Sequence, residues 1–141
     1  MKKFISIILA LSLILSLSVS VFADYDNIKV LLNGTEIEFD QKPVMAEGDR
    51  VLVPVRLIAE KFGAILGYDE ETETVMATVD DTIIILQIGA SEMHINGETV
   101  GLDVPAQEIN GRTLIPVRAF AEAFNCKVEW NEELETVTIT R

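Results

Sequence analysis

An internal repeat constrains the fold of this chain more than any other feature of its sequence. Residues 51–63 read VLVPVRLIAEKFG and residues 113–125 read TLIPVRAFAEAFN, so the pattern Pro-Val-Arg-x-x-Ala-Glu-x-Phe occurs twice. Two copies are too few for a solenoid. We therefore expect one pseudo-symmetric domain, with repeat units at about 28–79 and 84–141.

Each repeat unit predicts the same series of elements. Asn33-Gly34 and Asn96-Gly97 are strong hairpin turns, and a short strand later in each unit ends at a proline. A helix follows, because apolar residues then recur at helical spacing on one face. These residues are Val55, Ile58, Ala59 and Phe62 in one unit, and Val117, Phe120, Ala121 and Phe124 in the other. The fold class predicted is α+β, with antiparallel β-sheet packed on short helices and two pseudo-repeats of hairpin, strand, helix and hairpin.

The two helices are predicted to end at equivalent positions. Gly63 closes the first helix and Asn125 the second. Glycine and asparagine tolerate the left-handed backbone conformation of a helix C-cap best. We therefore expect a positive φ angle at both residues.

The segment at the junction of the two units is the most hydrophobic of residues 24–141. Thr82 to Ile88 is nearly continuous in apolar side chains, which is typical of a strand buried on both faces. No linker rich in glycine, serine or proline separates the units. We expect the units to fold as one cooperative domain.

The first 23 residues are typical of a signal peptide. Lys2 and Lys3 precede an apolar run from Phe4 to Leu17, and the segment ends in small residues. Cleavage is expected between Ala23 and Asp24, which leaves a domain of residues 24–141. The alternative is an uncleaved membrane anchor, since the apolar run approaches spanning length.

The second copy of the repeat carries the most specific signature. Residues 110–118 read Asn-Gly-Arg-Thr-Leu-Ile-Pro-Val-Arg, and the sequence resembles the copper amine oxidase N-terminal domain family of secreted bacterial proteins, also called stalk domains. The resemblance implies a small antiparallel sheet wrapped on a helix, and an accessory module outside the cell. It does not imply copper chemistry, because the catalytic part of amine oxidases is a separate domain.

The residue counts argue against most catalytic and metal chemistry. The chain has one histidine, His94, and one cysteine, Cys126, so we expect no catalytic residues, no metal site and no cofactor. Cys126 is expected to be a small buried residue. The net charge of −12 excludes nucleic acid and, after signal cleavage, membrane surfaces as partners. The acids cluster in turns, where weak calcium binding is the alternative to a solubilising role.

Arg56 and Arg118 recur at the start of the two helices, each followed four residues later by a glutamate. One interpretation is a structural pair that pins the helix to the sheet, and the other is an arginine that binds a carboxylate or a sugar. We assign the structural signature of the repeat to Pro54, Arg56, Glu60, Phe62, Gly63, Pro116, Arg118, Glu122, Phe124 and Asn125.

The function predicted is a secreted, non-catalytic binding or structural module that acts at the cell envelope or in the medium. Its partner would be an extracellular protein or a cell-wall component, with the chain either free or associated with the wall. The first alternative is a carbohydrate- or peptidoglycan-binding module that uses Tyr68 and Trp130 as stacking platforms. The second is a small carboxylate-dependent hydrolase. Exposed rings at both positions would favour sugar binding, and buried rings a plain interaction module.

The leader gives the first prediction. The mature protein should begin at Asp24, because the small residues before it suit signal peptidase. Intact-mass measurement of protein recovered from the medium checks this. Full-length chain retained in the membrane fraction would instead support the anchor.

Overall fold

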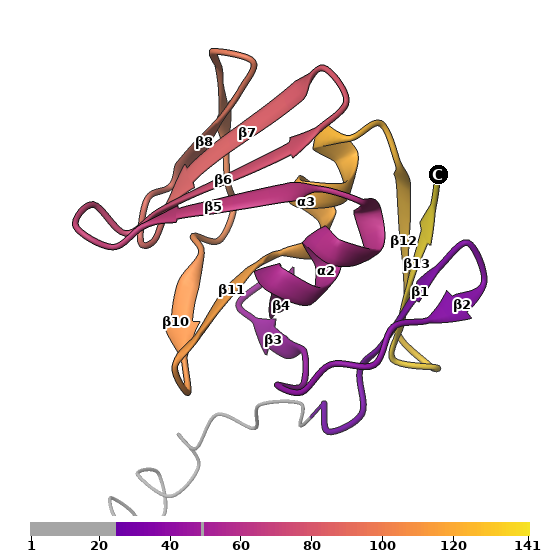
Figure 1. The fold of residues 1–141 in the computed structure, drawn as a ribbon. Helices are drawn as coiled ribbons and strands as arrows, with labels where there is room; N and C mark the ends of the chain where they lie inside the picture. Colours follow the sequence, from indigo (N-terminus) through magenta and orange to yellow (C-terminus); the bar gives the residue numbers. More distant parts are fainter. Residues whose placement is uncertain (1–24, 49) are drawn as a thin grey trace, which may run out of the picture.

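The computed structural model describes residues 25–48 and 50–141, which fold into short strands around two helices (Figure 1). The expected leader and the cleavage site at Ala23 and Asp24 lie outside these residues. The strands are β1 (Lys29–Leu32), β2 (Thr35–Glu36), β3 (Val44–Ala46), β4 (Arg50–Pro54), β5 (Ile65–Asp69), β6 (Thr74–Val79), β7 (Thr82–Gln87), β8 (Glu92–Ile95), β9 (Glu98–Gly101), β10 (Gln107–Ile109), β11 (Arg112–Pro116), β12 (Lys127–Asn131) and β13 (Thr136–Thr140). The helices are α2 (Val55–Phe62) and α3 (Val117–Ala123).

The strands form three sheets. Their orders are β12-β13-β1-β2, β10-β11-β4-β3 and β5-β6-β7-β8-β9. This predominance of strands with two short helices agrees with the α+β class, and every strand pair except one is antiparallel among the described residues. Within the same residues, no helix is long and apolar enough to cross a membrane.

The exception is the pair formed by β1 and β13, which run parallel. The expectation of a purely antiparallel sheet was wrong at this point. In the five-stranded sheet, β7 lies between β6 and β8 and keeps every neighbouring pair antiparallel. None of the described strands takes that place in the sheet of β1 and β13, so these two strands pair directly.

The pair of strands β4 and β11 positions the two helices. These strands are antiparallel, with Val53 opposite Ile115, and each runs through a proline into a helix. Helix α3 packs against β4 and α2 against β11, so each helix contacts the strand that leads into the other (Figure 1). Strands from both predicted units pair in all three sheets. The repeat itself and the single cooperative transition stay predictions from the sequence.

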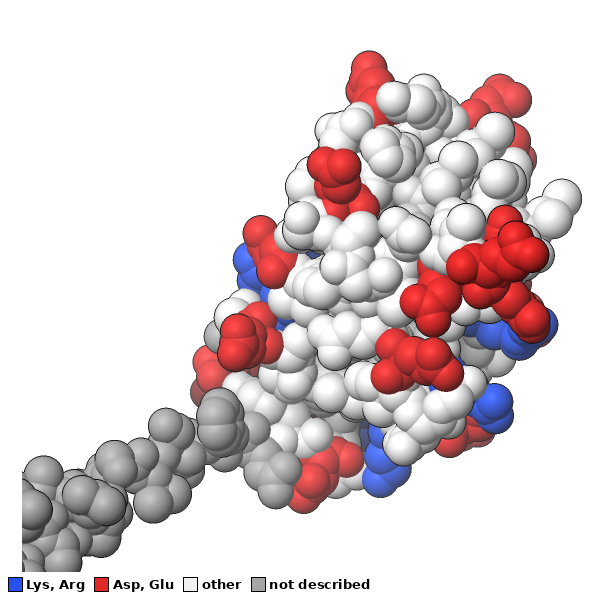
Figure 2. All heavy atoms as spheres, turned by 90° about the vertical axis from the view of Figure 1, so that its left-hand side faces the viewer, with Lys and Arg blue, Asp and Glu red and all other residues white. Residues whose placement is uncertain are grey.

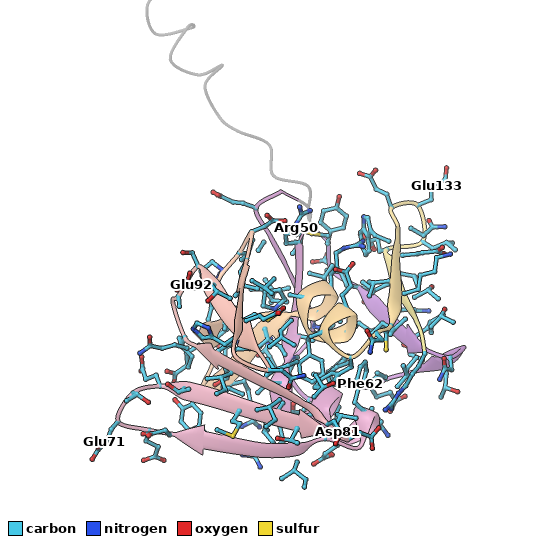
Figure 3. All side chains as sticks on the ribbon, turned by 90° about the horizontal axis from the view of Figure 1, so that it is seen from above. Arg50, Phe62, Glu71, Asp81, Glu92 and Glu133 are labelled. Atoms are coloured by element: carbon cyan, nitrogen blue, oxygen red, sulfur yellow. The ribbon has the colours of Figure 1, made fainter. Side chains whose placement is uncertain are left out.

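Three phenylalanine rings fill the space between the helices. The ring centroids of Phe62 and Phe120 are 5.3 Å apart, and those of Phe120 and Phe124 are 5.0 Å apart, both edge to face. Phe62, at the end of α2, is buried, whereas Glu71, Glu92 and Glu133 project from the periphery (Figure 3). The predicted apolar faces of both helices are buried, so that part of the prediction is confirmed.

The predicted helix ends are also confirmed. The φ angle is 72° at Gly63 and 63° at Asn125. In each case the next residue closes the turn, since the backbone N–H of Ala64 donates to the carbonyl of Ala59, and that of Cys126 to the carbonyl of Ala121. This is the Schellman arrangement, in which a left-handed residue ends the helix.

The prediction for the junction strand was wrong. Ile84 and Leu86 of β7 are buried, but Ile83 is 41% exposed and Ile85 is half-buried. The strand is therefore covered on one face only. The reason is that both helices lie on the same side of the five-stranded sheet, which leaves the other side without a covering layer among the described residues (Figure 1).

The helix ends give a stability prediction. Gly63→Val should lower the free energy of unfolding by about 1–2 kcal/mol, because a β-branched side chain resists the left-handed conformation. No atom lies within 4 Å of the added Cβ, so steric overlap adds nothing. Urea unfolding measures the change. Gly101→Val is the control, because Gly101 has open space but no positive φ angle. An equal loss in the two variants would contradict the role of the backbone angle.

Candidate functional site

An open pocket of about 780 Å³ lies between the start of α2, strand β5 and the turn of the β10–β11 hairpin. It contains four of the signature and stacking residues assigned from the sequence, Pro54, Arg56, Glu60 and Tyr68. Polar residues from distant parts of the chain complete the lining; they are Glu38, Asp40, Glu70, Glu108 and Arg112.

Tyr68 supplies the aromatic surface of the pocket. It lies opposite Val75 on the inner face of the five-stranded sheet, yet it is 48% exposed because β5 is the edge strand. Partial burial and then the carboxylates of Glu73 and Glu108 raise the pKa of the phenol above its ordinary value. The pocket therefore combines an accessible ring with a negative potential.

The two repeated arginines have different roles. Nη1 of Arg118 donates to the carbonyl of Val128 at 3.0 Å and lies 3.4 Å from Oε1 of Glu122, so it pins α3 to β12. The side chain of Arg56 is exposed at the pocket, and no hydrogen bond or ion pair joins it to another described residue. Arg118 makes the contacts expected of a structural pin, and no such contact of the Arg56 side chain is present among the described residues. The pocket itself separates the start of α2 from β5, where the corresponding partner would lie.

A second arginine of the pocket is already paired. Nη2 of Arg112 donates to Oδ2 of Asp40 at 2.7 Å, which holds the pKa of that carboxyl below its ordinary value, with help from the backbone N–H of Gln41. Arg50 and Asp103 form the matching pair at 2.5 Å beside a smaller pocket of about 230 Å³. Each pair joins an arginine of one predicted unit to an aspartate of the other. Both are well exposed, so their contribution to stability is modest.

Trp130 does not share the exposure of Tyr68. It lies on β12 in a different sheet, is half-buried, and meets the ring of Tyr25 edge to face at a centroid distance of 5.9 Å. The structure does not bring the two candidate platforms together. Two exposed rings would have favoured sugar binding and two buried rings a plain interaction module. With one ring exposed and one half-buried, the exposure of the rings does not decide between these two functions.

Comparison with known proteins identifies the family. A family model described as copper amine oxidase N-terminal domain matches residues 31–139. The chain belongs to the copper amine oxidase N-terminal domain family. A search of curated proteins found no match. The copper amine oxidase N-terminal domain is a non-catalytic module, which is consistent with a structural or binding role.

The copper in the family name does not fit the side chains of this member. Among residues 25–48 and 50–141, no group of three or more histidine, cysteine, aspartate or glutamate side chains could hold a metal ion. Cys126 is buried, as predicted, and burial raises the pKa of its thiol. His94 lies exposed on β8, where Nδ1 is 3.2 Å from Oγ1 of Thr99.

The sequence analysis did not predict that Asp40 and Arg112 of this domain belong to the pocket. Asp40 and Arg112 pair across 72 positions of the chain, and no local pattern links them. A signal was present, since Arg50 and Arg112 precede the two repeat motifs at equivalent positions. The equivalent positions of the two arginines did not predict which carboxylate pairs with each of them.

The two arginines give a matched prediction. Arg118→Ala should lower the free energy of unfolding by about 1 kcal/mol, because the partly buried carbonyl of Val128 loses its charged donor. Arg56→Ala should change it by less than about 0.5 kcal/mol, as for an exposed side chain without partners. Urea unfolding of both variants tests the difference. Equal losses would show that Arg56 is also a structural pin.

Proposed function

We propose that this chain is a non-catalytic binding module whose ligand occupies the pocket between the start of α2 and β5. The observation that carries the proposal is the state of Arg56. Its counterpart Arg118 is used to hold the fold, whereas Arg56 presents a guanidinium unpaired among the described residues, beside the exposed ring of Tyr68. A large pocket with an aromatic surface and a few converging polar groups is the usual form of a ligand site.

The charges of the pocket restrict the class of ligand. Five carboxylates line it, from Glu38, Asp40, Glu60, Glu70 and Glu108. Only two arginines oppose them in the described lining, and Arg112 is already paired with Asp40. Carboxylates accept hydrogen bonds from hydroxyl, amide and ammonium groups, and they repel anions. The ligand class supported is therefore neutral, with hydrogen-bond donors for the carboxylates and an acceptor for the guanidinium of Arg56.

The expected leader supports a place of action outside the cytoplasm. On this proposal the partner is an extracellular protein or a component of the cell wall. The acidic charge of the whole chain disfavours attachment to anionic wall polymers, so recognition would depend on the pocket rather than on general electrostatic adhesion.

Carbohydrate or peptidoglycan recognition is the second candidate, and the exposure of Tyr68 favours it. A sugar ring can stack on the phenol while its hydroxyl groups donate to the surrounding carboxylates. Trp130 is covered by Tyr25, so such a site would have one platform.

The hydrolase alternative lacks comparable support. A catalytic acid needs a raised pKa. Among the carboxyl groups in the described part of the chain, Asp40 and Glu129 show resolved changes in pKa, and both are lowered by a neighbouring basic side chain.

Binding to natural material tests the proposal. The purified chain without its leader is incubated with isolated bacterial cell walls and, separately, with culture-supernatant proteins. Tyr68→Ala and Arg56→Ala should each weaken retention by about tenfold, because each removes one of the two main contacts. Lys29→Ala and Leu134→Ala are the matched controls, since both residues are exposed and outside the pocket. Retention that survives both pocket changes would refute the proposal, and retention on walls alone would favour the carbohydrate candidate.

A further inference from the structure

The five-stranded sheet has one covered face and one uncovered face. The covered face packs on the helices and is almost entirely apolar; its buried members are Val75, Ala77, Ile84, Leu86 and Met93. The side chains that alternate with these residues point to the opposite side. We call that side the outer face and define it by Ile65, Gly67, Met76, Ile83 and Ile85.

Strand register arranges the apolar residues of the outer face in two adjacent rows, with the polar side chain of Thr78 between Ile65 and Ile83. Ile65 is opposite Thr78, which is opposite Ile83, and in the next row Met76 lies between Gly67 and Ile85. Ile65 is 77% exposed, Met76 44% and Ile83 41%. Scattered apolar side chains on a surface are ordinary, but a contiguous group on one sheet marks an interaction site.

The surroundings of the outer face carry one sign of charge. The sequence has no lysine or arginine from Phe62 to Gly111, the segment that contains the whole five-stranded sheet. Acidic residues lie at its turns and strand ends; they are Asp69, Glu70, Glu71, Glu73, Asp80, Asp81, Glu92 and Glu98. In Figure 3, Glu71 and Glu92 project from the periphery of these strands, and in Figure 2 the basic side chains gather in the lower part of the molecule.

We propose that the outer face docks a protein segment whose apolar side chains are framed by lysine and arginine. Charge complementarity selects this occupant, because every Asp, Glu, Lys or Arg side chain on β5 to β9 and their turns is a carboxylate, while the polar neighbours of the apolar centre, Thr78 and His94, carry no formal charge. A second copy of the chain would place acids against acids, and nucleic acid or an anionic membrane would be repelled in the same way.

This surface is distinct from the ligand pocket. The side chains of Leu66 and Tyr68 of β5 line the pocket, whereas that of Ile65 points to the outer face; Gly67, which has no side chain, borders both surfaces. The two surfaces can therefore be altered separately, and the docking of a basic segment does not depend on the function proposed for the pocket.

The test uses two synthetic peptides of leucine and lysine with equal composition. One segregates leucine on a single helical face, and the other has the same residues in a mixed order. Isothermal titration at low and physiological salt should show that the segregated peptide binds the chain without its leader more tightly. Ile65→Thr combined with Ile83→Thr should weaken its binding by about tenfold or more, since two apolar contacts are lost while β-branching is kept.

Control measurements establish whether the peptide binds at the outer face. Leu134→Thr should leave binding unchanged, because Leu134 is 68% exposed and lies in the turn between β12 and β13. Urea unfolding checks that the double variant is folded. Amide shift mapping on the unaltered chain gives an independent location, which should include Ile83 and Ile85 of β7, a strand that lines no part of the pocket. Unchanged binding in a folded double variant, or shifts confined to the pocket, would overturn the proposal. Self-association of the chain through the outer face, seen by sedimentation, would also overturn it.

Discussion

The contact among the rings of Phe62, Phe120 and Phe124 joins α2 to α3 at the centre of the core. Phe62 ends α2, Phe120 lies within α3 and Phe124 directly follows it, and each helix follows directly from a strand of the central β4–β11 pair. Each helix also contacts the strand that leads into the other, so the three buried rings meet between the helices and join the two halves of the core.

The two halves of the chain differ at the arginines that begin α2 and α3. The side chain of Arg118 spans from α3 to the carbonyl of Val128, whereas that of Arg56 lies exposed at an open pocket. Two segments with nearly the same sequence thus place the same side chain in different surroundings. The same division is seen in the aromatic positions, since Trp130 is covered by Tyr25 and Tyr68 is not.

Local patterns in the sequence were sufficient for the helices, their left-handed ends and the Asn-Gly turns, because neighbouring residues determine these features. They failed where distant segments decide the outcome. The parallel pairing of β1 with β13 depends on which strands meet, and the exposure of Ile83 depends on which side of a sheet a helix covers. Arg56 and Arg118 have nearly the same sequence neighbours, so no sequence argument could have separated their roles. The pocket was missed for the same reason, since Asp40 and Arg112 meet only in the folded chain.

The absence of lysine and arginine from the five-stranded sheet has a consequence for proteolysis. A protease that cuts after basic residues has a site at Lys61 and its next one at Arg112, with every strand of this sheet in between. Local opening of β5 to β9 therefore offers such an enzyme nothing to cleave, however often it happens. Resistance of this part of the chain to trypsin-like enzymes is a property of its composition and would persist even in the unfolded state.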